Sequence, residues 1–162
     1  MKKYKWIIIL INLLVLLGLF NNSIVKKEKL LSEGKLILLE LAPVDPRSLI
    51  QGDYMRLRYA ISENSNHGGI SKRGFCVVKL EENGIAKRVR IQDDRNPINK
   101  SEYLIEYTSK GFRGINIGSE SFFFQEGEAE KYENAKYGGL KVDSKGNSIL
   151  IGLYNDDVKK IE

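Results

Sequence analysis

The feature that most constrains this chain is a stretch of twenty uncharged residues close to its N-terminus, at positions 6–25. The first fifteen residues of the stretch are apolar except for Asn12. At a rise of 1.5 Å per residue, twenty helical residues span about 30 Å, the thickness of the hydrocarbon core of a bilayer. Trp6 suits one interface, and Lys26 and Lys27 suit the other. Residues 6–25 therefore predict a transmembrane helix, and the lipid bilayer is the first partner that we expect.

A basic flank followed by an apolar stretch is also the layout of a cleavable signal peptide. No pair of small residues in an Ala-x-Ala arrangement follows the stretch, which instead continues as Gly18-Leu19-Phe20 and two asparagines. We therefore predict an uncleaved signal anchor at residues 1–27 and a soluble domain at residues 28–162. A short N-terminal flank normally stays in the cytoplasm while a long domain crosses the membrane. We expect a single-pass protein of the cell membrane with its N-terminus inside and its domain outside the cytoplasm.

The excess positive charge lies beside the anchor and not in the domain. The net charge is +5, and residues 1–27 contain five lysines and no acidic residue. The remaining 21 basic residues balance the 21 acidic residues of the chain, so residues 28–162 are neutral overall. A nucleic-acid surface would place its positive charge on the folded domain. We therefore expect no nucleic-acid partner.

Few residues of the chain are suited to metal or redox chemistry. Cys76 is the only cysteine, which excludes an intramolecular disulfide, and its setting in Phe75-Cys76-Val77-Val78 predicts a small buried residue of a strand. His67 is the only histidine, so a histidine-based metal site or a Ser-His-Asp triad cannot form. The paired acids at 93–94 and 156–157 are more typical of solvated loops than of a cation site. We expect no metal and no cofactor.

The domain shows many short apolar or alternating runs separated by turn signals. The anchor helix is expected to continue to residue 31 and to stop at Gly34. Asn83-Gly84 is a strong hairpin signal, and a short helix is expected at 126–135. No strand–helix–strand alternation is present, which favours a mainly β fold with one short helix, either an antiparallel sandwich or a partly open barrel. Strands are expected at 35–41, 54–61, 74–80, 85–91, 102–108, 113–117, 121–124, 140–143 and 149–154.

The most distinctive local pattern is the segment from Asp45 to Tyr59. Asp45-Pro46 favours a turn, and Gly52 is expected at a positive φ, where the chain leaves a single helical turn. Asp53 stands where the next strand begins, and its carboxylate can accept backbone N–H groups or pair with Arg47. From position 54 the residues alternate. Met55, Leu57 and Tyr59 are expected on the inner face, and Tyr54, Arg56 and Arg58 on the outer face. We favour a structural role for the motif over a recognition site.

This segment contains Gly52-Asp53-Tyr54, then Leu57, then Tyr59, and it resembles the defining motif of the GDYXXLXY family. A looser similarity continues through 122–127 and 132–135. The resemblance implies a small membrane-anchored bacterial protein with an uncharacterised function. It also implies an association with polytopic membrane proteins.

One enzymatic interpretation is suggested by a second, partial similarity. Residues 49–53 are similar to the end of the serine box of signal peptidases, and the stretch around Lys87 is similar to their lysine box. Counting back from the glycine of that box places Val44 at the position of the nucleophilic serine, and Ser48 is out of register. Because valine has no hydroxyl group, Lys87 would have no nucleophile to activate. We therefore expect no catalysis.

Two functions remain open. The first is an accessory or interaction module of a membrane complex, in which Asn12 offers a polar contact to a partner helix. The second is a binding domain for a small ligand or envelope component around Asp53, with Arg47, Tyr54 and the Arg56/Arg58 face. A signal-peptidase relative without its nucleophile is a remote third alternative.

Overall fold

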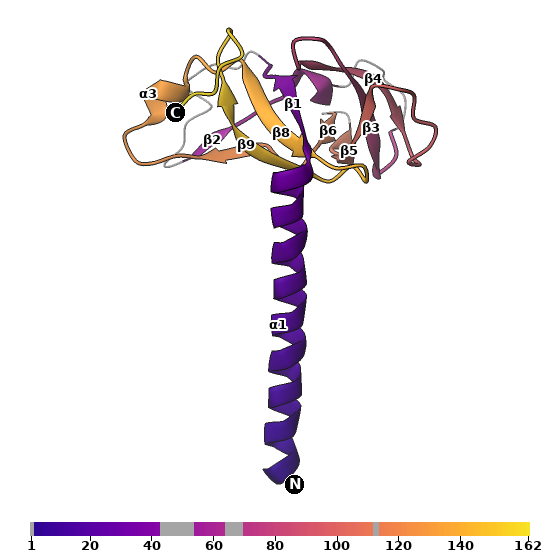
Figure 1. Cartoon of the computed structure of the whole chain (residues 1–162), viewed down its shortest axis with the longest axis vertical. Coiled ribbons are helices and arrows are strands. Elements are labelled where there is room, and N and C mark those ends of the chain that lie inside the picture. Colours follow the sequence, from indigo (N-terminus) through magenta and orange to yellow (C-terminus); the bar gives the residue numbers. More distant parts are fainter. Residues whose placement is uncertain (1, 43–53, 64–69, 112–113) are drawn as a thin grey trace.

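The computed structural model describes residues 2–42, 54–63, 70–111 and 114–162. It consists of one long helix, α1 (Lys2–Glu33), that projects from a β domain (Figure 1). Residues 4–29 of the helix are exposed, although most of them are apolar. Its segment Tyr4–Glu33 has a mean hydropathy of 2.3 over its most apolar window, and it is long and apolar enough to cross a membrane. An exposed apolar helix of this length is suited to anchoring the chain in a membrane.

The helix leads into the sheet without a linker. As predicted, α1 stops at Gly34, whose N–H donates to the carbonyl oxygen of Leu30 at 3.0 Å. The first strand, β1 (Lys35–Glu40), begins at the next residue. Leu30 is buried against the domain, and Nζ of Lys141 donates to the carbonyl oxygen of Gly34 at 2.9 Å. These contacts hold the end of the helix directly on the sheet.

The described residues of the β domain form nine strands in three antiparallel sheets, which do not close into a barrel. The sheet that joins the helix has the order β1-β8-β9, the largest sheet has the order β4-β3-β5-β6, and β2 pairs with β7 in a two-stranded ribbon. The predicted mainly β, antiparallel fold is confirmed. The remaining strands are β2 (Tyr54–Arg56), β3 (Arg73–Leu80), β4 (Ala86–Gln92), β5 (Glu102–Ser109), β6 (Ile115–Asn116), β7 (Ser121–Phe123), β8 (Tyr137–Val142) and β9 (Ser148–Tyr154).

A single hydrophobic core joins the three sheets. It is built from alternate residues of the strands, because one face of each sheet turns inward. The predicted β3–β4 hairpin is present, and Asn83 Oδ1 accepts the N–H of Ile85 at 3.0 Å in its turn. The largest fully buried side chains of this core are Ile37, Leu39, Tyr59, Val78, Ile105, Tyr107, Leu140 and Leu153.

The strand predicted at 54–61 is wrong in its length. Pairing with β7 ends at Arg56, after which the N–H of Leu57 donates to the carbonyl oxygen of Glu120 at 2.8 Å. The chain then changes partner: Tyr59 forms an antiparallel bridge with Leu41 beyond the end of β1. A 3-10 helix, η1 (Ala60–Ser62), follows. The segment therefore joins two sheets, and it cannot remain one straight strand.

The helix predicted at 126–135 is also too long. Only α3 (Ala129–Tyr132) is helical. Gly127 has a φ of +84°, a left-handed conformation that an α-helix does not contain. At the other end, the N–H of Lys136 donates to the carbonyl oxygen of Tyr154 at 2.8 Å, which draws the chain back into the sheet.

The loop between β4 and β5 is held by a forked ion pair. Arg90 Nη1 and Nη2 each donate at 2.9 Å to one carboxylate oxygen of Glu102. Asn99 adds a backbone N–H at 2.9 Å and a side-chain N–H at 3.0 Å to the same carboxylate. These donors lower the pKa of Glu102 from 4.5 to about 2. The ionised carboxylate therefore fastens the loop to the sheet.

This pair predicts a pH-dependent contribution to stability. Because the pKa of Glu102 is lowered in the folded state, its contribution is complete above pH 4.5 and is lost as the pH falls from 4.5 towards 2. At pH 7 we expect a lower urea midpoint for Glu102→Gln than for the wild type, with the gap closing in acid. The exposed Glu82→Gln should show no such gap. A gap that is unchanged at low pH would contradict the assignment.

Candidate functional site

The described part of the motif begins at its tyrosine. Asp45, Arg47, Gly52 and Asp53 lie outside the described residues. The expected roles of these four residues, and the ligand-binding alternative around Asp53, therefore stay predictions. From Tyr54 onward each motif residue can be placed.

Tyr59 is the structural centre of the described motif. Its side chain is 0% exposed, and its hydroxyl donates to the carbonyl oxygen of Ser119 at 2.7 Å. Burial, with a smaller effect of the Glu120 charge, raises the pKa of Tyr59 far above its ordinary value, so the hydroxyl stays a donor. The ring also lies on Gly138 of β8, where a Cβ would be 2.8 Å from Tyr59 Cε1. Tyr59 thus ties the end of the motif to the β7 loop and to β8.

The other inner residues of the motif are core residues as well. Met55 is 2% exposed and Leu57 is 3% exposed, and both belong to the cluster that contains Tyr59. The alternation predicted from the sequence therefore holds, although the strand ends early. The inner half of the motif serves packing, and only its outer half is available to a partner.

The outer half forms one face of the β2–β7 ribbon, which we call the outer ribbon face: Tyr54, Arg56, Ser121 and Phe123. Tyr54 lies opposite Phe123 in the register, and Arg56 lies opposite Ser121. The rings of Tyr54 and Phe123 are 5.7 Å apart at an angle of 39°. Phe123 is 73% exposed, an unusual position for a phenylalanine. The structure thus joins a predicted motif residue, Tyr54, to an aromatic residue that the sequence analysis did not single out.

The alternate side of β7 faces the interior. Phe122 packs edge-on against Tyr132 of α3 with ring centroids 4.9 Å apart, and Phe124 lies 5.7 Å from the same tyrosine. These residues belong to the looser C-terminal similarity. They form an aromatic cluster that holds α3 on the ribbon. Since successive residues of a strand point to opposite faces, the run of three phenylalanines places Phe123 outward.

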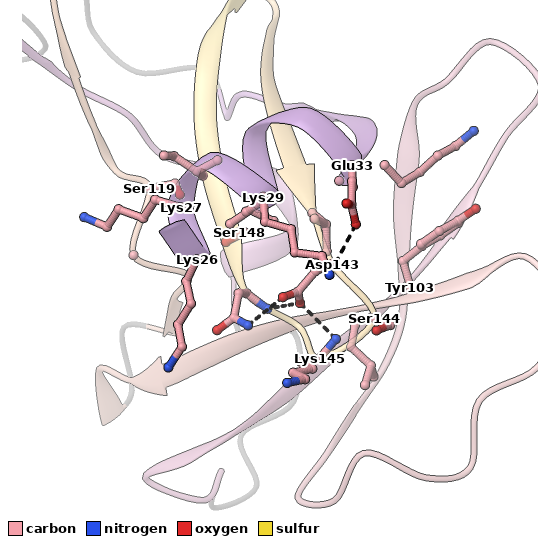
Figure 2. Close-up of a pocket in the computed structure, with 18 of the residues that line it drawn as sticks. Lys26, Lys27, Lys29, Glu33, Tyr103, Ser119, Asp143, Ser144, Lys145 and Ser148 are labelled. Carbon is pink, nitrogen blue, oxygen red and sulfur yellow. Dashed lines mark hydrogen bonds and ion pairs between the residues drawn. The ribbon is translucent and has the colours of Figure 1, made fainter. Parts of the chain in front are cut away.

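A second feature is a cleft of about 1360 Å³ between the end of α1 and the side of the β domain that faces this helix (Figure 2). We call this side of the domain the underside. One wall is the helix from Ser23 to Gly34, and the other contains the β8–β9 turn and the loop after β6. Its acidic residues are already engaged: Glu33 lies 3.6 Å from Lys29, Glu102 binds Arg90, and Asp143 accepts N–H groups of the β8–β9 turn. The basic residues that line it are Lys26, Lys27, Lys29, Lys35, Arg95 and Lys145.

Two described residues with side chains that can take part in catalysis are Cys76 and Lys87. Cys76 is buried, as predicted, and burial raises the pKa of its thiol to about 12. Nζ of Lys87 lies 2.8 Å from Glu81, which raises the pKa of the lysine and keeps it protonated. Val44 and Ser48 lie outside the described residues. Within the described ranges, no group of three or more His, Cys, Asp or Glu side chains is arranged to hold a metal ion.

Comparison with known proteins gives one match. No curated protein and no solved structure is significantly similar to this chain. The model of a protein family, described as GDYXXLXY protein, matches residues 16–153, which is most of the chain. The match includes the end of α1, the motif at 52–59 and the β3–β4 hairpin. The chain belongs to the GDYXXLXY protein family.

Proposed function

We propose that this protein is a membrane-anchored, extracytoplasmic interaction module of a membrane complex in a bacterial cell envelope, without catalytic activity of its own. Its partner would be a polytopic membrane protein that contacts α1 within the bilayer. The domain would then form the part of the complex that lies at the outer surface of the membrane.

The observation that carries this proposal is Asn12 in the middle of an exposed apolar helix. The side chains at positions 6–11 and 13–20 are apolar, and no described residue of the domain packs on this part of the helix. An amide that faces hydrocarbon without a partner is unfavourable. A hydrogen bond to a neighbouring helix relieves that cost and contributes about 0.6–2 kcal/mol to helix association.

The junction between the helix and the sheet supports the same proposal. Leu30, Gly34 and Lys141 join α1 to the domain without a flexible linker. A partner that fixes the rotation of the helix would therefore also fix the direction in which the domain faces. A flexible tether would transmit no such orientation.

The test is photo-crosslinking along the helix in living cells. Leu16 lies one turn from Asn12 on the same side of the helix, whereas Leu14 points to the opposite side. A photoreactive residue at Leu16 is expected to give one crosslinked product with a multi-spanning protein. The same residue at Leu14 is expected to give none.

A pair of matched substitutions makes this test sharper. Asn12→Leu in the Leu16 background should abolish the product, whereas Asn21→Leu should leave it intact, because Asn21 lies on the opposite side of the helix. Equal products at Leu14 and Leu16 would contradict the proposal. So would a product that contains only a second copy of this chain.

A further inference from the structure

The end of the apolar stretch and the start of the sheet lie close together along α1. From Lys26 to Glu33 the helix rises by about 10 Å, at 1.5 Å per residue. The headgroup layer of a bilayer is about 5–7 Å thick on each side of the hydrocarbon core. When residues 6–25 span the bilayer, the junction of helix and sheet at Glu33 therefore lies about 3–5 Å beyond the headgroup layer, close enough for side chains of the underside to reach the headgroups. The cleft along residues 23–34 then extends through the depth of the headgroups.

The outer ribbon face points towards the same level. Ser121 lines the cleft together with Lys26 and Lys27 of the helix. Phe123 is two residues further along β7, so its side chain lies on the same side of the strand as Ser121. In Figure 1, β7 (orange, without a label) runs along the lower edge of the domain at the level where α1 ends, and β2 begins beside it. The exposed pair Tyr54–Phe123 therefore belongs to the underside of the domain.

The composition of this underside matches a membrane interface. Aromatic residues favour the interface, where a ring can bury its apolar body while a hydroxyl or a backbone group stays in water. Ile98, which is 41% exposed, adds an apolar side chain to the wall of the cleft. The cleft carries six basic and three acidic side chains, which leaves three positive charges in excess. Of the six basic side chains, Lys29 is already paired with Glu33. Lys145 and Arg95 bring positive charge from the domain itself.

We propose that the underside of the domain is a lipid-binding surface. The Tyr54–Phe123 pair enters the interface of the bilayer, and the cleft binds phosphate groups of anionic phospholipids through Lys145, Arg95, and Lys26 and Lys27 of α1. We identify the binding partner of this surface as a bilayer because the same helix that spans the membrane forms one wall of the cleft. This inference rests on the anchor and not on the proposed protein partner.

The test uses the full-length protein, one copy per lipid nanodisc, with an environment-sensitive NBD fluorophore on a single introduced cysteine. The native Cys76 is buried and should not react. Phe123→Cys places the fluorophore on the outer ribbon face. Asp157→Cys is the control, because the turn at 155–158 lies at the top of Figure 1, far from α1. The discs contain either phosphatidylcholine alone or a mixture with phosphatidylglycerol.

The fluorophore at position 123 is expected to emit at shorter wavelength than the one at 157 and to lose its quenching by aqueous iodide. The shift should be larger in the phosphatidylglycerol discs, and about 1 M salt should remove that difference. Arg95→Gln with Lys145→Gln should also remove it. Lys136→Gln with Lys159→Gln, two exposed lysines near the turn at the top of the domain, should not.

Each other outcome would overturn part of the proposal. A water-like, iodide-quenched signal at position 123 in both kinds of disc would show that the underside does not touch the bilayer. A lipid-like signal that is indifferent to phosphatidylglycerol would exclude the anionic preference. Because the nanodisc holds one copy, contact between two copies of the chain cannot produce the signal.

Discussion

Replacing Tyr59 by alanine is expected to lower the free energy of unfolding of the β domain by about 3–5 kcal/mol, as for other large aromatic side chains in a core. The side chain is fully buried and touches β8 at Gly138. Its removal leaves a cavity and takes away the hydrogen bond to Ser119. Because a domain of this size usually has only about 5–15 kcal/mol of stability, the melting temperature should fall by many degrees or folding should fail. Thermal unfolding of the full chain in detergent, followed by circular dichroism, measures the effect.

Two matched tyrosine variants separate the effect of the lost hydrogen bond from the effect of the lost ring. Tyr59→Phe keeps the ring but leaves the carbonyl oxygen of Ser119 without its donor, which costs about 1–3 kcal/mol when the group is buried. Tyr54→Ala removes a tyrosine of the same motif from the outer ribbon face, where it is 36% exposed, so its effect on melting should be small. If Tyr59→Ala melted like Tyr54→Ala, the structural role that we assign to the inner half of the motif would be wrong.

The inner and outer halves of the motif were predictable from its sequence because a strand has a period of two. The alternation placed Met55, Leu57 and Tyr59 inside and Tyr54 outside, and the structure places them so. The length of the strand was not predictable in the same way. It ends where the chain stops pairing with β7 and begins to pair beyond the end of β1. The place of this change is set by two hydrogen bonds, between Leu57 and Glu120 and between Arg58 and Ala42, whose partners are about 15 to 65 residues apart along the chain.

The exposure of Phe123 could not be predicted from the sequence either. A run of three phenylalanines predicts a buried strand, since each residue is strongly apolar. The structure buries part of Phe122 and Phe124 against Tyr132 but leaves Phe123 exposed beside Tyr54. Only the pairing of β7 with β2, at an edge without a covering layer among the described residues, brings Phe123 to the surface. The cleft likewise depends on how α1 joins the sheet, which no local pattern encodes.

The second large effect concerns the anchor. Leu13→Arg combined with Leu16→Arg places two charges near the centre of the predicted span. Each arginine there costs about 2.5–3.5 kcal/mol for insertion, and each lost leucine removes a small favourable contribution. We expect the double variant to leave the membrane fraction almost completely. Leu13→Val with Leu16→Val changes the same positions without charge and should stay in the membrane.

The central claim is that an uncleaved helix holds the domain outside the cytoplasm, and labelling of intact cells tests it most directly. Asp157→Cys exposes one thiol on the turn at 155–158, while the wild type has only the buried Cys76 and serves as the unreactive control. A membrane-impermeant maleimide should label the variant in intact cells, in the membrane fraction and at the mass of the full chain, 18.4 kDa before the label. The double-arginine variant should be labelled only after lysis. Labelling of the otherwise unchanged Asp157→Cys protein only after lysis would invert the topology, and a labelled product shortened to the region after Phe20 would show that the anchor is cleaved.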